Sequence, residues 1–397
     1  MEKLSSRIIN MAASQTIAMN QKGKDLKAQG VDVINLSVGE PDFHTPHHIK
    51  EAVKKAVDDN YSFYPPVPGY PELRKAIVNK FKEQNNLDYE MDQIVVSSGA
   101  KHSIVNVLLA IVDKGDEVII PAPYWVSYAE QVKIAEGTNV ILNTSIENDF
   151  KITPEQLQEA ITGKTRAFMI CSPSNPTGNF YSKEELEGLA RVLEKHENII
   201  VISDEIYEHI NFVGEHQSIA QFDFLKDRVV VVNGISKGYA MTGYRIGYIA
   251  APVWIAKGVS KLQGQFTTGP ASVAQIASIT ALSGDQTPTI EMREAFRRRR
   301  DLVVGRLQKI EGVKVNLPEG AFYVFPDMSS FYGKSFKGKP IENSVDLCMY
   351  LLEEGHIATV PGSGFGDDNC IRISYANSDE NLVKAMDRLE KALAELN

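Results

Sequence analysis

The pattern of hydrophobic positions between about residues 50 and 290 alternates short apolar runs with longer stretches of helical periodicity. Strands that are covered on both faces are apolar throughout, whereas half-exposed strands alternate with polar residues. Five runs are of the first kind: Ile94–Val96, Val118–Ile120, Ala167–Ile170, Ile199–Ile202 and Val229–Val232. The pattern therefore predicts an α/β fold with a mainly parallel sheet wrapped by helices.

Two helices between these runs have clear start signals. Thr153 is followed by a proline at the first helical position and by Gln156, which together make an N-cap and a capping box. Ser182 and Glu185 form a second box. These signals are structural and imply no chemistry.

The pattern changes after about residue 290. A long charged helix is followed by two short strand-like segments, 320–326 and 370–375, and by a final helix from Ser378. No repeat and no Gly/Ser linker divides the chain. We predict a large domain of residues 50–290 and a smaller α+β domain, formed by residues 291–397 together with the N-terminal segment 1–49.

The composition is that of a globular protein in solution, with 43% apolar and 23% charged residues among 397. No apolar run is long enough to cross a bilayer, and residues 1–10 lack the apolar stretch of a signal peptide. We therefore expect a cytoplasmic protein without a membrane partner.

The net charge of −9 argues against a nucleic-acid partner, whose phosphates need cationic surface. The basic run of residues 297–300 lies in a helical stretch that opens with Glu291 and Glu294, so it predicts a solvated or interface helix face. Three dispersed cysteines without CxxC spacing predict reduced, buried thiols. His44, His47 and His48 lack metal-ligand spacing, so no metal site is expected.

Chemically informative residues follow all five apolar runs, at the sheet edge where α/β proteins bind ligands. After the first run, Gly99, Ala100 and Lys101 open a helix whose free N–H groups suit a phosphate. After the second, Trp125 could stack on a planar ring. After the third, two prolines fix the backbone around Asn175.

The last two runs end in ionisable groups. Asp204, with Tyr207 three residues later, follows the fourth run, and a buried carboxylate there needs a cation. Lys237, with Arg245 further on, follows the fifth. Each signal has an ordinary alternative: a strand-Gly-helix turn, a packing tryptophan, a plain turn, or a salt-bridge lysine.

One ligand accounts for all of these residues, namely pyridoxal 5'-phosphate. Lys237 would form the imine with its aldehyde, and Asp204 would keep the pyridine nitrogen protonated. The other predicted contacts are hydrogen bonds from Tyr207 and Asn175 to the ring oxygen, a cover over the ring from Trp125, and phosphate binding by Arg245 with the Gly99 turn.

With these residues in place, the chain resembles the class I pyridoxal-phosphate aminotransferases, in particular the bacterial aspartate and prephenate aminotransferase branch, nearly from end to end. The motifs that carry the resemblance are Gly39-Glu-Pro-Asp, Tyr64 before Gly69-Tyr-Pro-Glu-Leu-Arg74, Tyr124-Trp-Val-Ser-Tyr, Asn175-Pro-Thr-Gly, Asp204-Glu-Ile-Tyr, Ser236-Lys with Arg245 eight residues later, and Arg372-Ile-Ser-Tyr.

The resemblance implies a fold-type I transferase in which Lys237 is the Schiff-base lysine. It implies that Arg372 binds the substrate α-carboxylate in a two-pronged contact, beside Gly39, which leaves room for the substrate. It also implies a homodimer in which Tyr64 reaches the cofactor phosphate of the other subunit. One departure is Gly234, where some relatives have a serine, so the hydroxyl contact to the phosphate is assigned to Ser236.

Lys101 is the position that bears on specificity. A cation at a helix N-terminus opposes the helix dipole and needs a compensating anion, and in this branch the matching lysine contacts the distal carboxylate of the substrate. We therefore expect aspartate or glutamate as amino donor and a 2-oxo acid such as 2-oxoglutarate as acceptor. Thr16 and Lys101 leave prephenate open as another acceptor, and a lysine that merely neighbours the phosphate is the alternative.

Three other functions fit the same cofactor residues. An aromatic or broad-range aminotransferase would differ only in the side-chain pocket, and a pyridoxal-phosphate lyase would release ammonia or a thiol. A cofactor-binding regulator usually carries an added DNA-binding segment, whereas here nearly every residue is used by the enzyme pattern.

Overall fold

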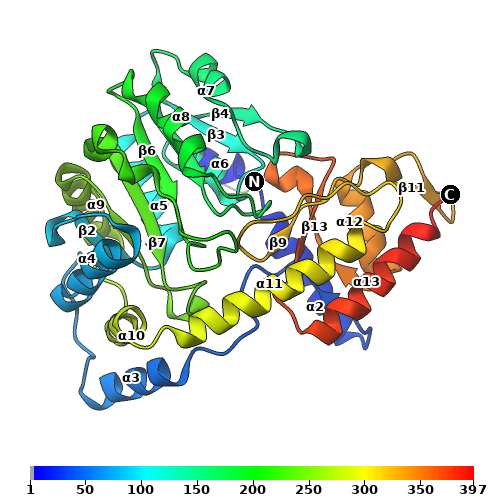
Figure 1. The fold of residues 1–397 in the computed structure, drawn as a ribbon, viewed down its shortest axis with the longest axis horizontal. Coiled ribbons are helices and arrows are strands. Elements are labelled where there is room, and N and C mark those ends of the chain that lie inside the picture. Colours follow the sequence, from blue (N-terminus) through cyan, green and yellow to red (C-terminus); the bar gives the residue numbers. More distant parts are fainter. Residues whose placement is uncertain (1–3) are drawn as a thin grey trace.

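The computed structural model describes residues 4–397, and its core is a seven-stranded sheet (Figure 1). In spatial order the strands are β2 Ile94–Ser97, β8 Gly247–Ala250, β7 Val229–Gly234, β6 Ile200–Asp204, β5 Thr165–Cys171, β3 Glu117–Ala122 and β4 Thr138–Asn143. Neighbouring strands are parallel except for β8, which is antiparallel to both β2 and β7. The predicted α/β class with a mainly parallel sheet is confirmed.

All five predicted apolar runs are strands of this sheet. Alternate residues of one strand pack into different apolar clusters: Val201 belongs to the cluster on one face and Ile202 to the cluster on the other. Burial on both faces therefore explains why the runs contain no polar residues. The pattern missed β4, an edge strand that is only half buried, and β8, in which the apolar run is short and begins with a glycine.

Helices cover both faces of the large sheet. They are α3 His47–Asp58, α4 Pro71–Asn85, α5 Ala100–Ile111, α6 Ser127–Ile134, α7 Pro154–Ala160, α8 Lys183–Glu194, α9 Val253–Phe266 and α10 Ser272–Ser283. Both predicted capping boxes are present. Thr153 and Gln156 exchange hydrogen bonds at the start of α7, and Ser182 and Glu185 do so at the start of α8.

The second part of the molecule is built around the antiparallel sheet β13-β14-β9. Its strands are β13 Val360–Pro361, β14 Ile371–Ser374 and β9 Tyr323–Val324, and its helices are α12 Ser344–Glu353 and α13 Asp379–Ala394. Other short elements include α1 Ser6–Ile9 and the hairpin of β10 Ser335–Phe336 and β11 Lys339–Pro340. None of the helices within residues 4–397 is both long and apolar enough to cross a membrane.

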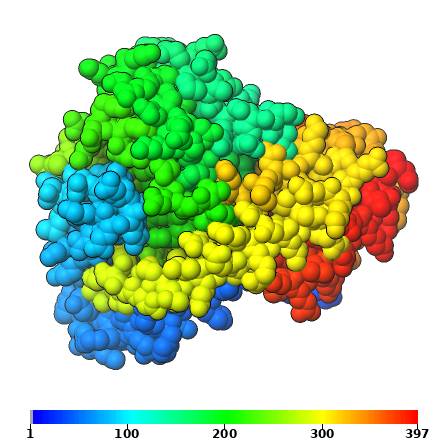
Figure 2. Space-filling model, in the orientation of Figure 1, coloured from blue at the N-terminus to red at the C-terminus, as the bar shows by residue number. Residues whose placement is uncertain are grey.

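The N-terminal segment packs against this second part. After α2 (Gln15–Ala28), strand β1 (Ile34–Asn35) pairs in parallel with β12 (Ile357–Ala358). The helix α11 (Thr287–Leu307) runs from the large sheet to the small one, and in the space-filling view its yellow surface connects the green and blue parts with the red part (Figures 1 and 2). These features support our proposed division at about residue 290, with the N-terminal segment assigned to the small domain.

Candidate active site

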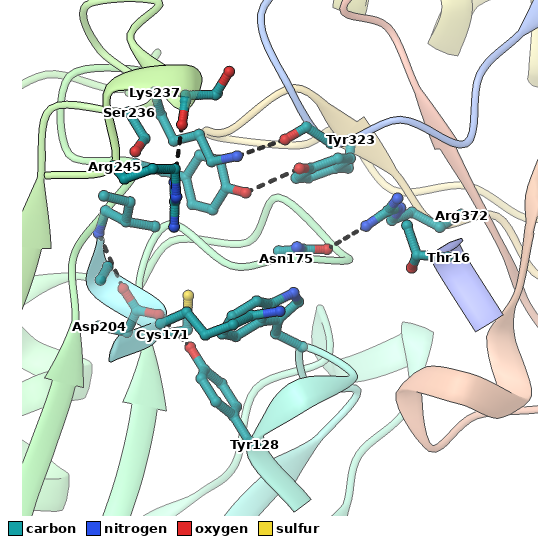
Figure 3. A pocket seen from close by; sticks show the side chains of 17 residues that line it. Thr16, Tyr128, Cys171, Asn175, Asp204, Ser236, Lys237, Arg245, Tyr323 and Arg372 are labelled. Atoms are coloured by element: carbon teal, nitrogen blue, oxygen red, sulfur yellow. Dashed lines mark hydrogen bonds between the residues drawn. The ribbon is translucent and has the colours of Figure 1, made fainter. Parts of the chain in front are cut away.

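A cavity of about 250 Å³ lies at the carboxyl ends of the parallel strands (Figure 3). Residues that follow all five predicted strands reach it, and they are joined there by the N-terminal segment and by β14 of the small sheet. The lining residues that the sequence predicted are Thr16, Gly39, Ala100, Lys101, Trp125, Asn175, Asp204, Tyr207, Ser236, Lys237, Arg245 and Arg372. The shared sheet edge brings together the residues that follow the strands, while Thr16, Gly39 and Arg372 reach the cavity from the N-terminal segment and the small sheet.

Lys237 lies in the turn after β7, and its ammonium group donates a hydrogen bond to the carbonyl oxygen of Gly39. Burial, reinforced by the positive charge of Arg372, lowers the pKa of Lys237 to about 8, although Glu40 opposes the shift. Within residues 4–397 no carboxylate lies within ion-pairing distance of its Nζ atom. Lys237 is therefore a half-buried amine with a lowered pKa and without an ion-pair partner among the described residues.

Asp204 is the last residue of β6 and is only 4% exposed. One carboxylate oxygen accepts a hydrogen bond from the Tyr128 hydroxyl at 2.6 Å, and the other accepts one from the Ile206 N–H at 3.2 Å. Burial raises the pKa of Asp204 to about 6, and both hydrogen bonds oppose that rise. No described side chain forms an ion pair with Asp204, so a basic ligand atom would supply the cation expected there.

Arg372 lies on β14 and is 1% exposed. Its guanidinium donates to Asn175 Oδ1 at 3.0 Å and to the carbonyl oxygen of Ser37 at 2.6 Å, while its Nε atom has no partner among the described residues. The aromatic rings of Tyr323 and Phe365 lie 4.5 and 5.0 Å from it. A buried guanidinium that has aromatic and amide neighbours but no carboxylate is suited to bind an anionic ligand.

A second cationic region lies at the start of α5. Gly99 is its N-cap, with φ of 90°, and a β-carbon at this position would collide with the guanidinium of Arg245. Arg245 donates to the carbonyl oxygen of Thr242 at 2.9 Å, and in the described chain it has no acidic partner. The N–H groups of Ala100 and Lys101 in the first helical turn have no backbone acceptor among the described residues, whereas that of His102 donates to the Gly99 carbonyl oxygen at 2.9 Å. This combination fits a phosphate group.

Several residues of the cavity were not found from the sequence. Tyr128 binds Asp204, Cys171 lies beside that pair, and the hydroxyl group of Tyr323 is 2.9 Å from that of Tyr207. Tyr323 comes from β9 in the small sheet, so no local pattern connects it with the strand ends. The motif around Trp125 did include Tyr128, but nothing in the spacing marked its hydroxyl.

Two predicted residues lie outside the cavity wall. Gly99 supports the cavity only through the close approach of Arg245, and Tyr64 is 92% exposed on the surface of the single chain. Gly234 also has a steric explanation, because a β-carbon there would lie 2.8 Å from the carbonyl oxygen of Ile246. A serine at position 234 would need a backbone shift, whereas Ser236 lines the cavity directly.

The donor set matches pyridoxal phosphate. Among residues 4–397 the cavity combines the half-buried amine of Lys237, the buried Asp204 carboxylate, which forms no ion pair, and the Gly99 turn with Arg245, which suits a phosphate. An aldehyde, a basic ring nitrogen and a phosphate would satisfy these three groups in turn. Fold and site together define a fold-type I pyridoxal-phosphate transferase.

Comparison with known proteins agrees with this class. Residues 31–389 match the family model "Aminotransferase class I and II", and the chain belongs to that family. It is 47% identical over 98% of its length to a bifunctional aspartate aminotransferase and glutamate/aspartate-prephenate aminotransferase of Petunia hybrida, of which 82% is covered. An aspartate/prephenate aminotransferase of Nitrosomonas europaea is 45% identical, with 99% of this chain and 100% of the relative covered.

Solved structures give the same result. A crystal structure of the aspartate aminotransferase from Rhizobium meliloti superposes with a TM-score of 0.97 at 42% identity, and each chain is covered completely. The Thermus thermophilus aspartate aminotransferase with maleate gives a TM-score of 0.93 at 41% identity, with 99% of this chain and 100% of that chain covered. The chain is therefore a pyridoxal-phosphate-dependent aminotransferase.

Proposed function

We propose that this enzyme transfers an amino group between aspartate or glutamate and a 2-oxo acid such as 2-oxoglutarate, and that it also accepts prephenate. The observation that carries this proposal is a pair of cations, Arg372 and Lys101, in one cavity without acidic partners among residues 4–397. A dicarboxylic substrate offers one carboxylate to each. The names of the relatives from Petunia and Nitrosomonas support the same substrates.

Lys101 provides the specificity in this proposal. It is the second residue of α5, and its Nζ atom lies 4.8 Å from the centre of the Trp125 ring. Although Lys101 is an exposed residue, desolvation of its ammonium group, with a smaller effect of Arg245, lowers its pKa, and an anionic ligand would offset this effect. Thr16 also faces the cavity, and its buried hydroxyl has no partner within the described chain, which leaves it free to contact a substrate.

The other proposed roles concern the cofactor. Arg245, Ser236 and the first turn of α5 would hold the phosphate, with Trp125 covering the ring. When bound, the cofactor supplies a carbonyl that takes up the amino group and a protonated ring that stabilises negative charge on the substrate α-carbon.

The remaining site residues orient the reactants and move protons. Asp204 would hold the proton on the ring nitrogen, while Tyr207 and Asn175 would bind the ring oxygen. Arg372 would fix the α-carboxylate beside Gly39, and the Nζ atom of Lys237 would accept the α-proton. The lowered pKa of Lys237 supports this last role because it increases the fraction of neutral amine near neutral pH.

A homodimer in the cytoplasm completes the proposal. Tyr64 and Phe63 are 92% and 78% exposed, which is unusual for neighbouring aromatic side chains and supports an interface with a second copy of the chain. In that dimer Tyr64 would reach the cofactor phosphate of the other subunit. Sedimentation of the wild type and of Tyr64→Ala, together with the cofactor dissociation constant of each, tests both statements.

The substrate proposal is tested by incubating the purified holoenzyme with aspartate and 2-oxoglutarate and measuring oxaloacetate and glutamate. Release of ammonia without glutamate would instead indicate a lyase, and binding without turnover a regulator. Equal rates with phenylalanine would favour the aromatic or broad-range alternative. In Lys101→Ala the preference for aspartate over alanine should fall about tenfold or more, the effect of one charge-assisted hydrogen bond; an unchanged preference would remove Lys101 from the specificity site.

A further inference from the structure

The hydrogen bond between Tyr128 and Asp204 has features that separate it from ordinary core packing. Tyr128 is 2% exposed, and its hydroxyl group donates to Asp204 Oδ2 at 2.6 Å, the short distance expected of a hydrogen bond to a charged oxygen. In the close-up view its ring rises from α6 toward Asp204 and Cys171, on the side of the cavity opposite Lys237 and Ser236 (Figure 3).

Tyr128 acts only as a hydrogen-bond donor here. Burial and the neighbouring charge of Asp204 raise its pKa well above the ordinary range of a phenol, so it keeps its proton. The pKa of Asp204 is instead subject to two opposing influences. Burial raises its pKa, and the Tyr128 hydroxyl is the largest influence in the other direction, since it stabilises the ionised carboxylate.

The position of Tyr128 is fixed by the same short segment that carries Trp125. The N–H group of Tyr128 donates to the carbonyl oxygen of Trp125 at 2.9 Å, and the two rings meet edge to face with centroids 5.4 Å apart. The predicted cover of the cofactor ring and the donor to Asp204 therefore lie on one turn. Any shift of this turn would move both.

We propose that Tyr128 is a positioning residue that holds Asp204 ionised and oriented toward the cofactor ring nitrogen. This inference rests on the proposed role of Asp204, and Tyr128 itself need not touch cofactor or substrate. Tyr128 would thereby control how the proton is distributed between the Asp204 carboxylate and the ring nitrogen. Without its hydroxyl, Asp204 becomes a stronger base and draws that proton away from the ring.

The test is Tyr128→Phe in the holoenzyme, with Tyr181→Phe as the matched control. Tyr181 is also buried, at 3% exposed, but its hydroxyl accepts a hydrogen bond from the N–H of Ile152, away from the cavity. In Tyr128→Phe we expect kcat to fall about tenfold with little change in KM, a weaker cofactor affinity, and a shift to higher pH of the transition in the visible absorbance of the bound cofactor. Tyr181→Phe should leave all three unchanged.

A double-mutant cycle separates this inference from the proposal on which it rests. Asp204→Asn alone should change the absorbance transition and the cofactor affinity, and adding Tyr128→Phe to it should have no further effect on either. If Asp204→Asn changes neither property, the proposed role of Asp204 fails. If Asp204→Asn acts but Tyr128→Phe behaves like Tyr181→Phe, or has its full effect in the Asp204→Asn background, only the role of Tyr128 is overturned. Circular dichroism and thermal melting of each variant monitor the fold, and the cofactor-affinity measurement requires no turnover.

Discussion

The turn after β6 has two sides that differ in how their buried charges are partnered. Asp204 and Tyr207 face the cavity, where Arg245, Arg372 and Lys101 lack acidic partners among residues 4–397. Glu205 and Glu208, from the same turn, face the other way. The difference indicates that a buried charge with a protein partner does not mark a functional site, whereas charged groups that share one cavity without such partners are candidates for one.

On that second side every carboxylate is paired. Glu208 forms an ion pair with Lys80 and accepts a hydrogen bond from Asn85 at 2.9 Å. Glu205 accepts hydrogen bonds from two serine hydroxyls and from His216 at 2.9 Å. Glu205, Glu208 and His216 are close enough to form a metal-ligand group, but these existing bonds give the cluster a structural explanation.

The largest effect on activity should come from Lys237→Ala, on the side of the turn that faces the cavity. We expect transamination to fall more than a thousandfold and the visible absorbance of the lysine-bound cofactor to disappear, because the variant lacks the amine proposed to bind the cofactor and move the proton. The melting temperature of the cofactor-free protein should stay close to that of the wild type. Retention of both activity and absorbance would disprove the assignment.

Lys80→Met should lower the stability of the protein and leave the cofactor site unchanged. It leaves Glu208 as an unpaired buried charge, which costs about 3–5 kcal/mol of unfolding free energy, so chemical denaturation should show a large loss. Spectra and KM of the protein that remains folded should be close to those of the wild type. A specific change in the cofactor spectrum, without loss of stability, would contradict a structural role for this pair.

Arg372→Lys tests the unpaired side by a charge-conserving change. Lysine cannot reproduce the two-pronged contact, so kcat/KM for aspartate should fall about thirtyfold or more, equivalent to about 2 kcal/mol. The stability of the cofactor-free protein should change little, since Arg372 has no carboxylate partner to lose. Equal losses in kcat/KM and in stability would mean that Arg372 serves the fold rather than the substrate.

The last prediction concerns the pH dependence of stability. Burial lowers the pKa of His209, which lies beside Glu208, from 6.5 to about 4. Between about pH 6.5 and 4 the unfolded chain therefore binds a proton at His209 that the folded chain does not bind. Stability should decrease as the pH falls through that window, by on the order of 1 kcal/mol per pH unit. Melting curves of wild type and His209→Asn across this range measure the effect, and identical slopes would rule it out.

The sequence predicted the centre of this molecule better than its margins, for physical reasons. Strands buried on both faces are apolar throughout, so all five were identifiable, whereas the edge strand β4 (Thr138–Asn143) has exposed ends and polar residues. The residues at the strand ends were identifiable because one ligand explains them together. Tyr323 was not, since it reaches the cavity from a sheet more than eighty residues away in the chain from Lys237.

The hydrogen-bond and ion-pair partners of these residues could not be predicted from the sequence pattern either. Nothing in the spacing of residues indicates that Tyr128 donates to Asp204, or that Glu208 is paired with Lys80 from a distant helix. These contacts are what distinguishes the side of the turn that faces the cavity from the side that carries Glu205 and Glu208. A motif identifies the residues of such a site, while their electrostatic state depends on tertiary neighbours.

The segment from Leu36 to Gly39 fixes the spacing between Arg372 and Lys237 through hydrogen bonds to its backbone. The carbonyl oxygen of Leu36 accepts a hydrogen bond from Ser374, that of Ser37 accepts one from Arg372, and that of Gly39 accepts one from Lys237. Three backbone carbonyl groups, at positions 36, 37 and 39, thus connect β14 and its Arg372 with Lys237. Inserting or deleting a single residue here would displace one anchor against the other, so homologous enzymes should vary the chemistry of this segment more readily than its number of residues.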